Sequence, residues 1–128
     1  MAPPIILLAD DEKDLVTAVT PQLERKGYRV LAAYDGQQAL AQVEAERPDL
    51  ILLDIAMPVM DGYSCLRELN NRYGPKAIPV VILTAREGMQ DLFQLEGVED
   101  YIVKPFDMHD LLARVAHILQ RRAEGRNP

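Results

Sequence analysis

The feature that most restricts the fold of this chain is a run of four aliphatic residues, Leu50 to Leu53, that leads directly into Asp54. A continuous apolar run has no polar side, so it predicts a strand that is buried on both faces, as in parallel sheets. Asp54 then lies at the carboxyl end of this strand, where open α/β sheets bind their ligands. An aspartate at a strand end can also be an ordinary solvated residue or a helix cap. Whether Asp54 has a functional role therefore depends on which residues lie at the ends of the other strands.

Strands and helices alternate along the rest of the chain. The other expected strands are Pro4–Ala9, Arg29–Tyr34, Pro79–Leu83 and Asp100–Val103. The expected helices are Lys13–Lys26, one that starts at Asp35-Gly36, one capped by Asp61, a short one at Met89–Leu95 and one at Asp107–Arg122. Five alternations of this kind predict an α/β fold, a doubly wound five-stranded parallel sheet with helices on both faces.

Two local features are exceptions to this regular pattern. Pro21 lies inside the first helix, and a proline there is expected to kink the helix or to shift its boundary. Residues 123–128 are polar, and we expect them to form a frayed tail or the start of a linker. The predicted domain therefore comprises residues 1–122.

Charge and composition exclude several classes of function. The chain has 128 residues, the length of one domain, and a formal net charge of −6. An acidic chain is a poor match to the phosphate backbone, so direct nucleic-acid binding is not expected. The sequence has neither an apolar segment of membrane-spanning length nor a charged signal-peptide start, and its single Cys65 cannot form an internal disulfide. These observations favour a cytoplasmic protein that does not contact a membrane.

Chemically matched side chains follow four of the five strands. Asp10 and Asp11 follow the first, Asp54 the third, Thr84 ends the fourth and Lys104 follows the fifth. The carboxyl ends of parallel strands meet at one edge of the sheet, where several carboxylates repel one another unless a cation lies among them. Mg²⁺ binds carboxylate oxygens and shares its coordination with phosphate, and a lysine contacts phosphate as a point charge. A carboxylate nucleophile, a divalent metal, a lysine and a hydroxyl suit the formation of an aspartyl phosphate.

The same stretches match those of a known family. They are Ile5–Glu12, Leu50–Pro58 with Asp61-Gly62, Val80–Ala85 and Asp100–Phe106, and together they span nearly the whole chain. In this order they resemble the receiver domain of two-component response regulators, the CheY-like family. The resemblance implies a (βα)5 fold with the flavodoxin-like strand order 2-1-3-4-5. It also implies a signalling switch that is controlled by phosphorylation.

The resemblance assigns a metal and a phosphorylation site. It implies that Asp54 receives the phosphoryl group. Asp10 and Asp11 would hold Mg²⁺ together with Asp54 and the backbone carbonyl of Ala56.

Further residues acquire roles in the same way. The resemblance implies that Lys104 pairs with the phosphoryl group and that Thr84 hydrogen-bonds it and moves toward it. Tyr101 would be the aromatic switch residue whose packing follows Thr84. Ala85 would leave room on the phosphate side of the backbone, and the Lys104–Pro105 peptide bond is expected to be cis.

Partners also follow from the resemblance. A histidine kinase or phosphotransfer protein would supply the phosphoryl group, and the domain would catalyse its own phosphorylation and dephosphorylation without being a metabolic enzyme. The output would be a downstream protein or a homodimer, bound through the face that follows Thr84. One departure lies on this face. The segment from Thr84 to Lys104 is shorter than in many members, with Leu95-Glu96-Gly97-Val98 before the fifth strand, so the helix there is expected to be short.

Two other functions remain open at this point. A phosphohydrolase of the haloacid dehalogenase type also places a nucleophilic aspartate after a buried strand, but it requires a second aspartate two residues later, where this chain has Ala56. A degenerate receiver would act only as a binding module. The presence of Asp10, Asp11, Asp54, Thr84 and Lys104 counts against that interpretation.

Overall fold

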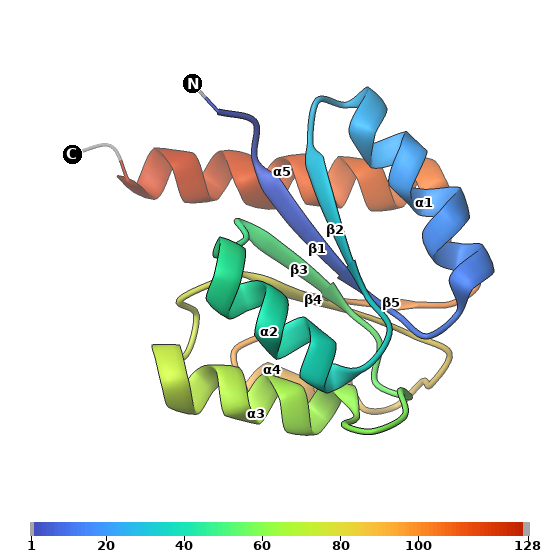
Figure 1. Ribbon diagram of the computed structural model, residues 1–128, viewed down its shortest axis with the longest axis vertical. Helices are drawn as coiled ribbons and strands as arrows, with labels where there is room; N and C mark the ends of the chain where they lie inside the picture. The colour runs from blue at the N-terminus through green and yellow to red at the C-terminus, as the bar shows by residue number, and fades with distance from the viewer. Residues whose placement is uncertain (1, 127–128) are drawn as a thin grey trace.

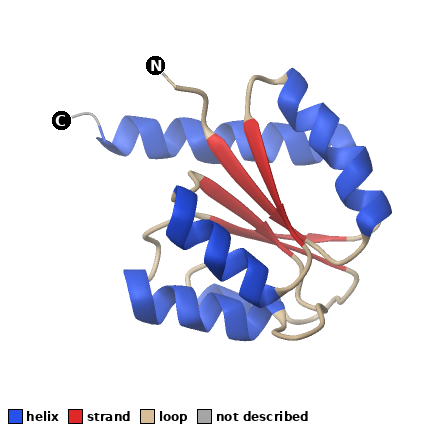
Figure 2. Ribbon diagram, viewed as in Figure 1, coloured by secondary structure: helices blue, strands red, loops and turns tan. Residues whose placement is uncertain are grey.

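A computed structural model describes residues 2–126 and shows five strands that alternate with five helices (Figures 1 and 2). The strands are β1 (Ile5–Ala9), β2 (Arg29–Ala33), β3 (Leu50–Leu53), β4 (Val80–Thr84) and β5 (Asp100–Val103). The helices are α1 (Lys13–Arg25), α2 (Gly36–Glu46), α3 (Gly62–Tyr73), α4 (Gln90–Leu95) and α5 (Met108–Arg126). The predicted α/β architecture is confirmed.

All five strands belong to one parallel sheet with the order β2-β1-β3-β4-β5, as the resemblance implied. The two most apolar strands, β1 and β3, are neighbours in the middle of the sheet, where Leu7 pairs with Ile51 and Ala9 with Leu53. All four residues of β3 are buried. A strand without a polar face is stable only where both of its faces are covered, so the apolar runs occupy the centre of the sheet.

The sheet lies between two layers of helices. Successive strand residues point to opposite faces, so Leu7 and Ala9 pack with residues from α2, α3 and α4, while Ile6 and Leu8 pack with residues from α1 and α5. Figure 1 shows α1 and α5 on one side of the sheet and the other three helices on the opposite side. Right-handed crossovers of a parallel sheet produce this division. No helix within residues 2–126 is long and apolar enough to cross a membrane.

One helix boundary differs from the prediction, and Pro21 does not shift another. Helix α1 continues through Pro21 from Lys13 to Arg25, close to the expected range of Lys13–Lys26. Pro21 and Thr17, whose carbonyl loses its helical partner, both lie on the exposed side of α1, where water can satisfy the carbonyl. Helix α5 extends to Arg126, so the expected tail is helical over residues 123–126, because arginine, alanine and glutamate are good helix formers. Residues 127–128 of that tail lie outside the described part of the chain.

Candidate functional site

The backbone ladder of the sheet continues one residue past three of the strands and fixes the start of each site loop. The amide of Asp10 donates to the carbonyl of Ala33, and the amide of Asp54 donates to the carbonyl of Ala9, both at 2.9 Å. The amide of Lys104 donates to the carbonyl of Thr84 at 2.7 Å. The side chains that follow β1, β3 and β5 are therefore set by the rigid sheet rather than by flexible loops.

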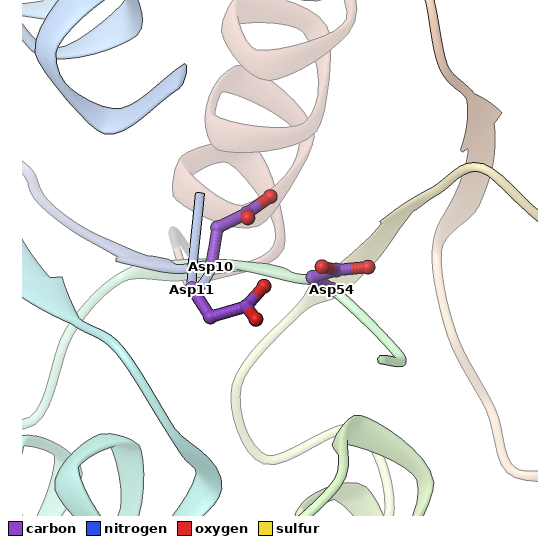
Figure 3. A group of neighbouring side chains, drawn as sticks. All are labelled: Asp10, Asp11 and Asp54. Carbon is purple, nitrogen blue, oxygen red and sulfur yellow. The ribbon is translucent and has the colours of Figure 1, made fainter. Parts of the chain in front are cut away.

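Three carboxylates meet at this edge of the sheet (Figure 3). One side-chain oxygen from each of Asp10, Asp11 and Asp54 lies within 4.8 Å of the other two. Asp10 is fully buried and Asp54 is only 5% exposed, whereas Asp11 is exposed. Acidic oxygens this close together are a donor set suited to a hard divalent cation. The described residues contain no other group of three acidic, histidine or cysteine side chains with this spacing.

Lys104 supplies the positive charge of the cluster. Its Nζ lies 2.7 Å from Oδ2 of Asp10, 2.8 Å from Oε2 of Glu12 and 3.5 Å from Oδ2 of Asp54. Burial tends to lower the pKa of Lys104, but the hydrogen bonds to Asp10 and Glu12 and the charge of Asp54 outweigh it and raise the pKa above its ordinary value. The lysine is therefore a permanent cation at neutral pH.

The carboxyl of Asp54 has a raised pKa. Burial, together with the nearby charge of Asp10, raises its pKa from 3.8 to about 6. Lys104 and the amide of Ala56, which lies 3.4 Å from Oδ1 of Asp54, act in the opposite direction and stabilise the carboxylate. Asp54 is thus mostly ionised at neutral pH, as a nucleophile requires, at some cost to the fold.

A glycine keeps the chain after Asp54 in place. The amide of Gly62 donates to the carbonyl of Ile55 at 2.8 Å, and any Cβ at this position would clash with the backbone carbonyl of Asp54. Asp61 caps α3 through a 2.7 Å hydrogen bond from the amide of Ser64, as expected. The Asp61-Gly62 pair therefore lets α3 begin directly behind Asp54.

Thr84 and Tyr101 are joined through a residue between them, Arg86. The amide of Arg86 donates to Oγ1 of Thr84 at 3.2 Å, and the hydroxyl of Tyr101 donates to the carbonyl of Arg86 at 2.6 Å. Thr84 is buried, whereas Tyr101 is half-buried and its ring packs against Phe93. The two residues expected to form a switch are therefore connected by the backbone of the β4–α4 loop.

Small residues lie in the loops that follow β3 and β4. Ala56 and Ala85 are both exposed and follow the ends of β3 and β4. The Lys104–Pro105 peptide bond is cis. Ala56 and Ala85 therefore place small side chains in the loops that follow Asp54 and Thr84.

Sequence reasoning missed three residues that contribute to this geometry. Glu12 binds Lys104, Arg86 joins Thr84 to Tyr101, and Phe93 packs against Tyr101. The run Asp10-Asp11-Glu12 was a visible signal for a third acid. The other two had none, because the role of Arg86 rests on its backbone, and the burial of Phe93 depends on tertiary packing.

Comparison with known proteins identifies the family. Residues 6–116 match the model of the response regulator receiver domain, so this chain belongs to that family. Members of this family work in two-component signalling, where histidine kinases or phosphotransfer proteins are their partners, and they typically bind Mg²⁺ at an acidic pocket.

Related proteins agree with this assignment. The alkaline phosphatase synthesis transcriptional regulatory protein PhoP of Bacillus subtilis is 42% identical over 118 residues, which cover 91% of this chain and 48% of that protein. The transcriptional regulatory protein PrrA of Mycobacterium tuberculosis is 41% identical over 121 residues, 93% of this chain and 51% of that protein. This chain thus spans about half the length of the curated relatives it matches.

Solved structures show the same fold. A CheY-like receiver domain protein from Methanospirillum hungatei superposes with a TM-score of 0.88 at 27% identity, covering 96% of this chain and 98% of that one. The beryllium-fluoride-activated receiver domain of RstA from Klebsiella pneumoniae superposes with a TM-score of 0.80 at 30% identity, covering 90% and 97%.

Proposed function

We propose that Asp54 is the phosphorylation site of this receiver domain and that the acidic cluster around it performs the transfer. The observation that carries this proposal is the position of Asp54, which is almost fully buried yet lies within 4.8 Å of two further carboxylates and 3.5 Å from the ammonium of Lys104. An aspartate with a purely structural role does not require two further carboxylates and an ammonium group beside it. Grouping like charges raises the free energy of the fold unless the arrangement serves a cation or a reacting group.

The proposed reaction transfers a phosphoryl group from a phosphohistidine of the kinase to Asp54. A carboxylate oxygen of Asp54 attacks phosphorus, and the P–O bond forms as the P–N bond breaks. The electron pair of that bond remains on the departing imidazole nitrogen, which takes up a proton from water. Lys104 balances negative charge on the transferring oxygens, and the hydroxyl of Thr84 turns from Arg86 to donate to one of them.

The donor set of the cluster fits Mg²⁺. Asp10, Asp11 and Asp54 provide carboxylate oxygens at mutual distances suited to one small ion, and the backbone carbonyl of Ala56 would complete the protein ligands. When bound, Mg²⁺ neutralises charge that builds up on the transferring oxygens. The exposed position of Asp11 leaves a side of the site open to water and to the donor.

The switch would start at Thr84. Once its hydroxyl turns toward the phosphoryl group, the hydrogen bond from Arg86 is lost, and the loop that holds the hydroxyl of Tyr101 is free to rearrange. We propose that phosphorylation thereby biases the face made of α4, β5 and α5 toward a second arrangement that binds a downstream protein or a second copy of the chain. In the structure, Arg114 on this face is paired with Asp100 at 2.9 Å and with Asp110 at 3.1 Å. The proposed second arrangement would exchange these intramolecular pairs for intermolecular ones.

The cellular setting follows the family. The PhoP and PrrA relatives are transcriptional regulators about twice as long as the matched region. We propose that this domain likewise acts in the cytoplasm through protein contacts and leaves any DNA binding to another part of such a regulator.

The direct test is incubation with acetyl phosphate and Mg²⁺, followed by intact mass measurement. We expect a gain of one phosphoryl group that requires Mg²⁺, is absent in Asp54→Asn and is kept in Asp91→Asn, which alters an exposed aspartate outside the cluster. Equal modification of Asp54→Asn and wild type would overturn the site assignment. Catalytic turnover of p-nitrophenyl phosphate would instead indicate a phosphohydrolase, and no modification of the wild type would indicate a degenerate receiver.

A further inference from the structure

Helix α4 is attached to the rest of the domain by a single buried side chain. Among its residues only Phe93 is buried, whereas Leu92 and Leu95 are exposed, Leu95 to 86%. The ring of Phe93 lies between two tyrosines, with its centroid 5.5 Å from that of Tyr63 on α3 and 5.9 Å from that of Tyr101 on β5. A helix with so few buried contacts must follow any displacement of the one residue that anchors it.

A polar cluster joins the end of α4 to α3. Glu96, the residue after α4, accepts a hydrogen bond from the hydroxyl of Tyr63 at 3.2 Å, and its backbone carbonyl accepts one from the side-chain amide of Asn70 at 3.0 Å. The guanidinium of Arg67 lies 3.8 Å from its carboxylate. Residues 63, 67 and 70 are spaced so that they lie on one face of α3. Glu96 is only 22% exposed in its side chain, so these contacts are partly shielded from water.

Together these contacts form an unbroken connection from the phosphorylation edge to α3. Thr84 accepts from the amide of Arg86, whose carbonyl accepts from Tyr101. Tyr101 packs on Phe93, and Phe93 packs on Tyr63 at a T-shaped angle of 86°. Because close-packed interiors do not leave gaps, a change in the position of the Tyr101 ring must be accommodated by Phe93, and then by Tyr63 or by α4 as a whole.

We propose that Phe93, Tyr63 and Glu96 are positioning residues that transmit the arrangement of Tyr101 to helix α3. This inference rests on the proposed role of Tyr101 as the switch residue. It adds a second route for the signal, because α3 packs on the face of the sheet opposite to α5 and is not part of the face made of α4, β5 and α5. The α3 surface around Arg67 and Asn70 then responds to phosphorylation even though α4 is only 6 residues long.

The test is NMR of the full chain with Mg²⁺, before and after addition of beryllium fluoride as a phosphoryl mimic. In the wild type we expect shifts at Thr84 and Tyr101, and also an α3 response at the backbone amides of Arg67 and Asn70 and the side-chain amide of Asn70, which lie beyond the first turn of α3 behind Asp54. Phe93→Leu should keep the first set and lose the second, because it removes the ring between the two tyrosines. Tyr63→Phe keeps the ring packing and removes only the hydroxyl, so it should weaken the response at Glu96 and Arg67 while the fold is retained.

A conservative variant separates transmission from simple packing. Glu96→Gln keeps an acceptor for Tyr63 and should retain the α3 response, whereas Glu96→Ala should reduce it. The proposal is overturned if α3 responds equally in Phe93→Leu and wild type, or if Tyr101 shifts in the wild type while α3 does not. If neither Tyr101 nor α3 responds, the proposed switch fails first, and the transmission through Phe93 fails with it.

Discussion

The ammonium of Lys104 lies 2.7 Å from Oδ2 of Asp10 but 3.5 Å from Oδ2 of Asp54. The lysine is therefore held by the fully buried Asp10 and by Glu12, which lies 2.8 Å away, more closely than by the carboxylate proposed to react. This difference between the contacts of Lys104 favours phosphoryl transfer. Asp10 keeps Lys104 in place, and the weaker contact with Asp54 can be given up when a phosphoryl oxygen arrives.

We predict that Lys104→Ala lowers the free energy of unfolding by about 3 kcal/mol in EDTA, because it leaves the buried charge of Asp10 without its partner. Excess Mg²⁺ should reduce this loss by restoring positive charge to the cluster. Urea denaturation with EDTA and with Mg²⁺ measures both effects. The control is Arg29→Ala, which removes an ion pair with Glu46 that is exposed and should cost less than about 1 kcal/mol with or without Mg²⁺. Equal losses in the two variants would show that Lys104 has no special structural role.

The same variant tests whether phosphorylation of Asp54 is coupled to the α4-β5-α5 face. We predict that Lys104→Ala still accepts some phosphoryl group at Asp54 but no longer changes the α4-β5-α5 face, because Lys104 joins the cluster to β5. The measurement is the change in self-association or partner affinity on phosphorylation. Equal changes in Lys104→Ala and wild type would count against this role.

The raised pKa of Asp54 predicts a pH-dependent effect on stability. Its pKa is about 6 in the folded chain, above the ordinary value of 3.8, so folding favours the protonated form. Below pH 4 the carboxyl is protonated in both the folded and the unfolded state, so it does not lower the free energy of unfolding. The loss of stability develops as the pH rises from 4 through 6. A shift of this size corresponds to about 3 kcal/mol at most, and relaxation of the structure around the charged form reduces it to about 1–2 kcal/mol.

We therefore predict that Asp54→Asn stabilises the metal-free domain by about 1–2 kcal/mol at pH 7.5 and has little effect at pH 4. Denaturant unfolding in EDTA across this pH range measures the difference. Glu87→Gln, which neutralises an exposed residue of the β4–α4 loop, should leave the pH profile unchanged. A gain of equal size at both pH values would show that charge at Asp54 is not the cause.

Mg²⁺ binding should relieve the repulsion among the clustered carboxylates. We predict that Mg²⁺ raises the melting temperature of the wild type and that Asp11→Ala abolishes this increase, because it removes one of the three clustered carboxylates. Without metal, Asp11→Ala should be at least as stable as wild type, since one repelling charge is gone. Thermal unfolding with and without Mg²⁺ tests this, with Asp14→Ala as a control from the first turn of α1. An intact Mg²⁺ response in Asp11→Ala would remove Asp11 from the metal site.

The fold was predictable because its signals are local. The apolar runs ending at Ala9 and Leu53 require burial on both faces, and alternation with helices leaves few topologies other than a doubly wound sheet. The convergence of Asp10, Asp54 and Lys104 followed from the topology, because parallel strands bring their carboxyl ends to one edge. The contacts of Glu12 with Lys104 and of Phe93 with two tyrosines depend on side-chain packing between distant segments, which no local pattern encodes.

The last prediction concerns a strained residue beside the site. Val59 has φ of +68° and is 74% exposed, and the amide of Met60 next to it donates to the carbonyl of Pro58 at 2.7 Å, which closes a tight turn around Val59. The positive φ and the hydrogen bond between residues 58 and 60 are those of a γ-turn, in which a β-branched side chain is strained, and asparagine adopts positive φ more readily than valine. We predict that Val59→Asn raises the free energy of unfolding by about 1 kcal/mol, because the exposed valine has little packing to lose. Val59→Ala serves as the control and should gain less, since it removes the branch but keeps the unfavourable φ. Urea denaturation compares the three proteins, and a less stable Val59→Asn would show that the valine side chain makes a contact that outweighs the strain.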